Sequence, residues 1–155
     1  MQGVQALIAT ANRRLAEWAC ERLQAAEITV CEEAADLESA VLLAVELRPD
    51  VCLLDVAIPG DAIAALQRIR ERAPTTRVVM LAAADDPALL PAVHAGANGC
   101  MIGTPDGPAL ARALADVLAG RAALPRGAAD ATRRRARTGL TARAMRHLAH
   151  IVPES

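Results

Sequence analysis

Hydrophobic and polar residues follow two alternating patterns along about the first 120 residues of the chain. One pattern consists of short runs rich in Val, Leu and Ile, which are typical of strands in a sheet that is buried on both faces. The other is a longer run in which apolar residues recur every three or four positions, as on one face of an amphipathic helix. The short runs predict strands at residues 4–9, 28–31, 51–55, 77–82 and 99–102.

The helical segments carry their own start and stop signals. Asn12 and Asp106 are placed to cap the first and last helices, because short polar side chains accept hydrogen bonds from the free amide groups there. Asp85-Asp86-Pro87 is predicted to open the fourth helix, with one Asp as the cap and the Pro in the first turn. The helices are predicted at 12–26, 36–47, from the turn at 59–60 to about 72, 85–96 and 106–120.

Five strands that alternate with five helices predict parallel βαβ units. The expected fold is therefore an α/β three-layer sandwich, in which helices cover both faces of a five-stranded parallel sheet. In such folds, binding sites form beyond the carboxyl ends of the strands, near the point where the strand order switches. The residues that end the first, third, fourth and fifth strands are therefore the candidates for function.

The composition changes near residue 123 and predicts three regions: a globular domain at 1–123, an Arg-rich linker at 124–139 and a helical segment at 140–155. Residues 1–125 carry 10 Arg against 16 acidic residues, a net charge of −6, whereas residues 126–155 carry 7 Arg against 2, a net charge of +5. An acidic body with a basic tail does not indicate a uniform nucleic-acid-binding surface.

Two features of the composition affect the chemistry. All 17 basic residues are Arg, with no Lys, and a single Trp is the only aromatic residue. The four cysteines form no CxxC pair and are predicted to be small hydrophobic residues in a reducing compartment, which speaks against zinc. No apolar run reaches the ~18 residues of a membrane span, and no signal peptide is visible, so a cytoplasmic location without membrane contact is expected.

The strongest motif surrounds Asp55, which ends the predicted central strand. The segments 49–60, 77–81 and 95–100, in this order and spacing, resemble the receiver domains of bacterial response regulators, in particular those joined to LuxR-type (NarL-type) helix-turn-helix domains. The resemblance covers roughly residues 4–122. It implies a CheY-like, flavodoxin-like fold with strand order 2-1-3-4-5. It also implies that Asp55 is the phosphoacceptor and that a histidine kinase is a partner.

Other positions depart from the pattern that the resemblance implies. Family members hold Mg²⁺ with an acidic pair after the first strand, where this chain has Thr10 and Ala11. They place a hydroxyl at the end of the fourth strand, a Lys at the end of the fifth and a switch aromatic in the fifth, where this chain has Ala82, Gly103 and Cys100.

The expected metal site is correspondingly poor. Only the Asp55 carboxylate and the backbone carbonyl of Ala57 remain as ligands, so at most a weak Mg²⁺ site is expected, with no other cofactor. Phosphoryl transfer depends mainly on arranged charges, so their loss argues against ordinary phosphorylation of Asp55. Asp55 is then interpreted as either a vestigial or an active phosphoacceptor.

Residues 139–149 resemble the opening helix of a LuxR-type DNA-binding domain, with Ala144 where that family has Glu. The recognition helix of such a domain would lie beyond Ser155. DNA contact is therefore expected only through a C-terminal domain that this chain lacks. The chain is either a truncated piece of a longer regulator or a receiver with a vestigial tail.

The leading hypothesis is an atypical receiver module of a transcriptional regulator, without enzymatic activity. Its output would be set by homodimerisation, through helices one and five or through helix four, strand five and helix five, or by a protein or ligand partner. One alternative is a conventional receiver phosphorylated on Asp55, which Mg²⁺-dependent phosphoryl uptake would distinguish. The other is a flavodoxin-like small-molecule-binding protein, although neither GxGxxG nor GxxxxGK[ST] is present.

Overall fold

The computed structural model describes residues 3–83 and 86–123 of the chain. Its strands are β1 (Gln5–Ala9), β2 (Thr29–Ala34), β3 (Val51–Asp55), β4 (Arg77–Ala82) and β5 (Gly99–Ile102). Its helices are α1 (Arg13–Ala25), α2 (Leu37–Leu47), α3 (Ala62–Arg72), α4 (Leu89–His94) and α5 (Gly107–Leu118). The predicted linker and C-terminal helix lie outside the described residues.

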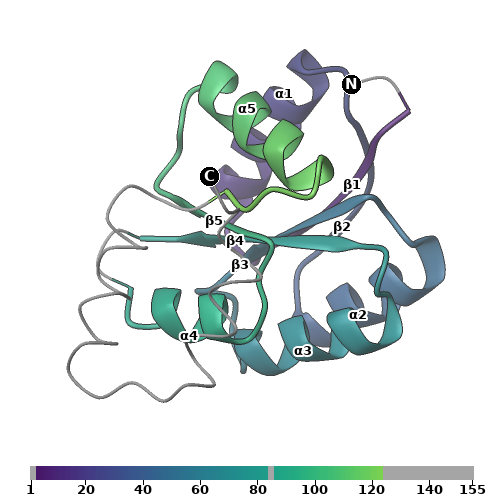
Figure 1. Cartoon of the computed structure of the whole chain (residues 1–155), viewed down its shortest axis with the longest axis vertical. Helices are drawn as coiled ribbons and strands as arrows, with labels where there is room; N and C mark the ends of the chain where they lie inside the picture. Colours follow the sequence, from purple (N-terminus) through teal and green to yellow (C-terminus); the bar gives the residue numbers. More distant parts are fainter. Residues whose placement is uncertain (1–2, 84–85, 124–155) are drawn as a thin grey trace.

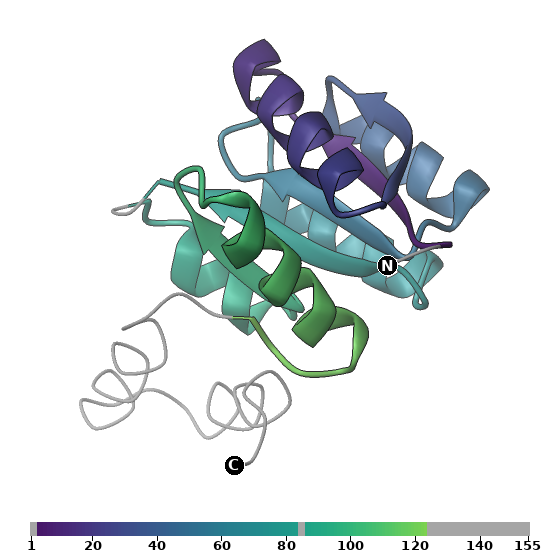
Figure 2. The same cartoon turned by 90° about the horizontal axis from the view of Figure 1, so that it is seen from above.

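The strands form one parallel sheet in the order β2-β1-β3-β4-β5, which confirms the predicted fold. Helices α2, α3 and α4 cover one face, while α1 and α5 lie side by side on the other (Figures 1 and 2). Each face has its own apolar core. Trp18 packs into the core under α1 and α5, and Val41 belongs to the core under α2, α3 and α4.

The central strand β3 is buried along its whole length, as its continuous apolar sequence predicts. It pairs with β1 on one side and β4 on the other, and the strand order reverses between β1 and β3. The loops after these two strands therefore diverge to opposite faces of the sheet. This divergence opens the place where a parallel sheet can hold a functional group, and Asp55 lies at it.

Side-chain caps were predicted for the first, fourth and last helices, and those at Asn12 and Asp106 are confirmed. The side chains of Asn12, Asp36, Asp61 and Asp106 each accept a hydrogen bond from an amide in the first turn of α1, α2, α3 and α5. The prediction for the fourth helix was wrong. The Asp86 carboxylate accepts from the amide of Ala88 and closes a turn, so that α4 begins only at Leu89.

Strand β2 is also longer than predicted, because it continues through Glu32 and Glu33 to Ala34. These two glutamates were placed after the strand, but they are exposed residues within it. A register shift between Ala6 and Leu7 of the paired strand β1 accommodates Cys31, which has no partner in that pairing. The strand was predicted too short because β2 lies at the edge of the sheet, where a strand tolerates charged residues that a central strand would exclude.

Candidate functional site

Asp55 is the last residue of β3 and is only 7% exposed. Its Oδ1 accepts a 2.9 Å hydrogen bond from the amide of Ala57, two residues further along the chain. Its Oδ2 accepts a 2.7 Å hydrogen bond from the hydroxyl of Thr10, at the end of β1. Both oxygens of the buried carboxylate are therefore engaged within the protein.

Thr10 is itself buried, at 6% exposure, and is held at three points. Its amide donates to the carbonyl of Ala34, its hydroxyl donates to Asp55, and its Oγ1 accepts from the amide of Asn12 at 3.0 Å. The sequence identified Thr10 only as the place of a missing acid. Its contribution as a hydrogen-bond donor to Asp55 was missed, although a hydroxyl residue at the end of β1 is a signal that could have indicated it.

The predicted metal ligands fit Mg²⁺ poorly. Ala11 is exposed and has no donor atom in its side chain, and Ala57 offers only its carbonyl oxygen. Mg²⁺ in proteins is usually bound by one or two carboxylates with several waters in near-octahedral geometry. In residues 3–83 and 86–123, no three His, Cys, Asp or Glu side chains gather closely enough to hold a metal ion. The residues around Asp55 therefore do not fit a Mg²⁺ site that needs a second carboxylate.

Strand β4 ends at Ala82 and strand β5 is followed by Gly103, so neither of these two positions carries a polar side chain. Ala82 is nearly buried, and its carbonyl accepts a 3.0 Å hydrogen bond from the amide of Gly103. Gly103 is exposed and has φ +69°, with no atom within 4 Å of the place where a Cβ would lie. The chain therefore supplies neither a hydroxyl nor an ammonium group at the positions where a phosphoryl group would need them.

Cys100 lies within β5 and is 2% exposed, in the core under α2, α3 and α4. Burial raises the pKa of its thiol from 9.0 to about 12, and burial does the same to the pKa of Cys52 in β3. Thiols in such surroundings remain protonated and unreactive at neutral pH. Cys100 therefore fills space in the core, as the sequence predicted for the cysteines of the strands.

Further polar residues that could carry chemistry have other places in the fold. Asp106 caps α5 by accepting from the amide of Ala109 at 2.8 Å, and the exposed Glu32 and Glu33 lie on the edge strand β2. His94 is half-buried at the end of α4, and His147 and His150 lie outside the described residues. The structure thus brings together Asp55, Thr10 and the backbone of Ala57.

A parallel sheet of this order, with a buried carboxylate at the end of its central strand, defines a receiver-type regulatory domain. Residues 7–115 match the family model of the response regulator receiver domain. The chain belongs to that family, and its relatives identify it as a receiver domain of the NarL/LuxR type of response regulator.

Two curated relatives illustrate the similarity. The chain is 38% identical over 107 residues to the DNA-binding transcriptional activator DevR/DosR of Mycobacterium tuberculosis, which covers 68% of this chain and 49% of the relative. It is 31% identical over 102 residues to the nitrate/nitrite response regulator protein NarL of Escherichia coli, with 64% and 47% covered. The chain spans about half the length of these relatives.

Solved structures agree on the architecture. A LuxR-family two-component response regulator from Aurantimonas matches this fold with a TM-score of 0.75 at 27% identity, covering 84% of this chain and 96% of that one. The receiver domain of the response regulator NarL from Mycobacterium tuberculosis gives a TM-score of 0.72 at 27% identity, covering 78% and 100%. Within the described residues, no helix is long and apolar enough to cross a membrane.

Proposed function

We propose that this chain is a receiver module whose output does not depend on phosphorylation of Asp55. The observation that carries this proposal is the hydrogen bond from Thr10 to Asp55, which stands where a receiver of the usual kind has a metal-binding acid. A hydroxyl in this position satisfies the carboxylate internally. The module would then regulate through homodimerisation or through a protein or ligand partner.

The chemistry of phosphoryl transfer supports this proposal. An incoming phosphoryl group brings negative charge, which a receiver neutralises with Mg²⁺ and an ammonium group, and arranged charges supply most of the catalysis. Here the carboxylate oxygens are both engaged by neutral donors, and Ala82 and Gly103 supply no compensating group. The hydrogen bond that Asp55 Oδ2 accepts from Thr10 lowers the electron density available for attack on a phosphodonor and supplies no positive charge for the phosphoryl group.

The remaining parts of the regulator are also proposals. Relatives of this chain are named as a DNA-binding activator and as response regulators. By that similarity, residues 1–123 would act as the regulatory domain, 124–139 as a linker, and 140–155 as the start of a DNA-binding domain. A histidine kinase remains a partner only if Asp55 accepts phosphate.

The experiment that tests this proposal is intact-mass measurement after incubation with acetyl phosphate and Mg²⁺. The wild-type chain, the Asp55→Asn variant and a receiver that retains both strand-one acids are treated in parallel, the last as a positive control. We expect a phosphate-sized gain in the positive control alone. A gain in the wild-type chain that requires both Mg²⁺ and Asp55 would instead establish the conventional phosphorylated receiver.

A further inference from the structure

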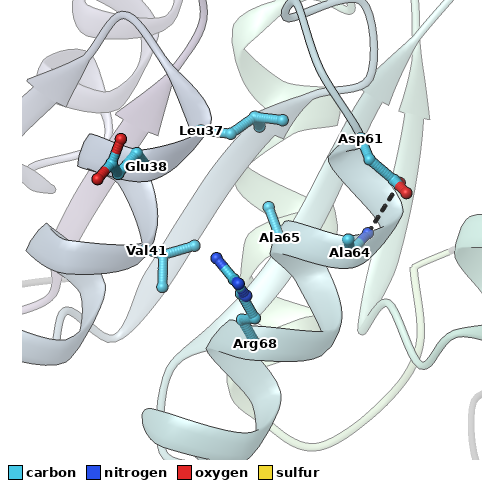
Figure 3. A pocket seen from close by; sticks show the side chains of 7 residues that line it. All are labelled: Leu37, Glu38, Val41, Asp61, Ala64, Ala65 and Arg68. Atoms are coloured by element: carbon cyan, nitrogen blue, oxygen red, sulfur yellow. Dashed lines mark hydrogen bonds between the residues drawn. The ribbon is translucent and has the colours of Figure 1, made fainter.

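Helices α2 and α3 leave an open groove between them on the face of the sheet opposite to α1 and α5. Its volume is about 350 Å³, and its floor is formed by the apolar side chains of Leu37, Val41 and Ala65 (Figure 3). Glu38 lies on the α2 side of the groove and Arg68 on the α3 side. The groove is thus apolar at its base, with an anion on one rim and a cation on the other.

The two rim charges are not paired within the protein. The ion pairs found in the described part of the chain join Arg13 to Glu17 and Arg121 to Asp116, so neither Glu38 nor Arg68 takes part in one. The third charged residue of the groove, Asp61, is already engaged, because its Oδ1 accepts from the amide of Ala64 at the start of α3. Within the described residues, one unpaired anion on α2 and one unpaired cation on α3 therefore line the groove.

Helix α2 adds an exposed apolar side chain beside this groove. Leu42 is 55% exposed and is the most exposed large hydrophobic residue found in the described ranges. It lies four residues after Glu38, so helical geometry places it on the same side of α2 as that glutamate. An exposed leucine next to an apolar groove costs solvation free energy that a partner surface would recover.

We infer that this groove and the α2 ridge beside it form a contact between two copies of the chain. A two-fold axis brings the same surface of each copy together, so the surface must be complementary to itself. An anion on one rim and a cation on the other meet that condition, because Glu38 of each copy then faces Arg68 of the other. Leu42 of each copy is placed to enter the groove of its partner.

This contact deepens the proposed function, on which it rests for the premise that the module works by self-association. Two parallel helices of 11 residues present a face about 16 Å long, so the buried area is at the small end for specific interfaces. The dimer is therefore weak and concentration-dependent. A weak receiver–receiver affinity suits a regulator in which a second domain of each copy also associates, because the two linked contacts then strengthen each other.

The test is a charge swap followed by sedimentation velocity on the full chain, without phosphodonor or Mg²⁺. Concentrations from about 5 µM to about 500 µM cover the range expected for a small interface. Glu38→Arg and Arg68→Glu each place like charges across both copies of the pair. Each is expected to weaken dimerisation by about tenfold, and the double variant is expected to restore it to within about threefold of wild type.

Two further variants make the result specific. Glu71→Arg reverses an exposed charge one turn after Arg68 on α3, outside the groove lining, and is expected to change the dimer less than Arg68→Glu does. Glu21→Arg lies on α1 and reports on an interface at the opposite face of the sheet. All of these positions are exposed, so circular dichroism is expected to show wild-type folding.

The contradicting outcomes are distinct. A chain that sediments as a monomer throughout, single variants without effect, or a double variant that fails to recover would each overturn the α2–α3 contact. So would a dimer that only Glu21→Arg weakens, since the interface would then involve α1. None of these results depends on phosphate uptake, so the failure of this contact and the failure of phosphorylation independence are measured separately.

Discussion

The hydroxyl of Thr10 donates a 2.7 Å hydrogen bond to Oδ2 of Asp55, joining the ends of two neighbouring strands that lie 45 residues apart in the sequence. In a receiver with two acids at the end of the first strand, this edge of the sheet concentrates negative charge that Mg²⁺ relieves. Here the neutral hydroxyl of Thr10 takes the place of an acid, so a hydrogen bond to Asp55 replaces the repulsion between carboxylates. We therefore expect the carboxyl edge of the sheet to be stable without a metal ion, and several measurements follow from this expectation.

Removing the hydroxyl should destabilise the fold. Thr10→Val keeps the shape of the side chain but leaves Asp55 Oδ2 and the amide of Asn12 without their partner. We expect a loss of about 1–3 kcal/mol in the free energy of unfolding, as is typical when a buried polar group loses its hydrogen bond. Urea denaturation measures this change, with the exposed Thr75→Val as the matched control. Equal stability of Thr10→Val and wild type would contradict the structural importance of this bond.

Restoring the acids should create a dependence on metal. In the Thr10→Asp/Ala11→Asp variant, new carboxylates lie beside Asp55, so the variant should unfold at a lower temperature than wild type in the absence of divalent ions. Saturating Mg²⁺ should raise its Tm by about 4 °C or more, while the wild-type Tm should not respond. Sodium chloride at equal ionic strength is the control. A wild-type Tm that rises with Mg²⁺ would show that this chain holds the ion after all.

Stability at high pH should depend on buried thiols. Burial raises the pKa of Cys52 and Cys100 to about 12 from 9.0, so the folded state keeps protons that the unfolded state loses. The stabilising contribution is complete below pH 9 and is lost as the pH rises toward 12. Each thiol contributes about 1.4 kcal/mol per pH unit in that window. The free energy of unfolding should therefore fall by about 2.7 kcal/mol per pH unit when both thiols titrate.

The chain has neither Lys nor Tyr to titrate in the same range, so the other side chains to consider there are Cys20 and Cys31, whose pKa values burial also raises. The Cys52→Ala/Cys100→Ala variant should be less stable at neutral pH but show a flatter decline between pH 9 and 12. Chemical denaturation at a series of alkaline pH values gives both slopes. If the two proteins decline in parallel, the buried thiols are not responsible.

The turn after β5 should depend on glycine. Gly103 has φ +69°, a conformation that costs an L-residue about 1 kcal/mol, while the surrounding space is open. Gly103→Ala should therefore lower the stability by about 1 kcal/mol through the backbone alone. Gly107→Ala is the matched control, since that glycine lies at the start of α5 without a positive φ and its Cβ would make only ordinary contact with Arg22. Thermal unfolding should rank Gly103→Ala below Gly107→Ala.

Much of the sheet could be predicted because burial leaves a local record in the sequence. Strands β3, β4 and β5 have the predicted bounds, since their apolar runs are continuous and end at polar or small residues. Edge strand β2 was predicted too short because its exposed glutamates have the composition of a loop. The start of α4 was misplaced because Asp86 caps a turn with the same hydrogen bond that would cap a helix.

The site could be predicted only in part, for a different reason. The position of Asp55 follows from its place at the end of a buried strand. The partner of its carboxylate is set by the pairing of β1 with β3, which places Thr10 beside it across a long stretch of sequence. No local pattern contains this relation. The roles of Ala11, Ala57, Ala82, Cys100 and Gly103 in signalling stay predictions.

The position of Trp18 makes its fluorescence a reporter for one face of the sheet and not for the other. The chain's single Trp packs into the core under α1 and α5, and the sheet separates it from α2 and α3. Its fluorescence should therefore respond to events at the α1–α5 face and remain nearly constant when a partner covers the groove on the other side. An emission spectrum recorded across a dilution series can thus report which face of the sheet is occupied, without a label.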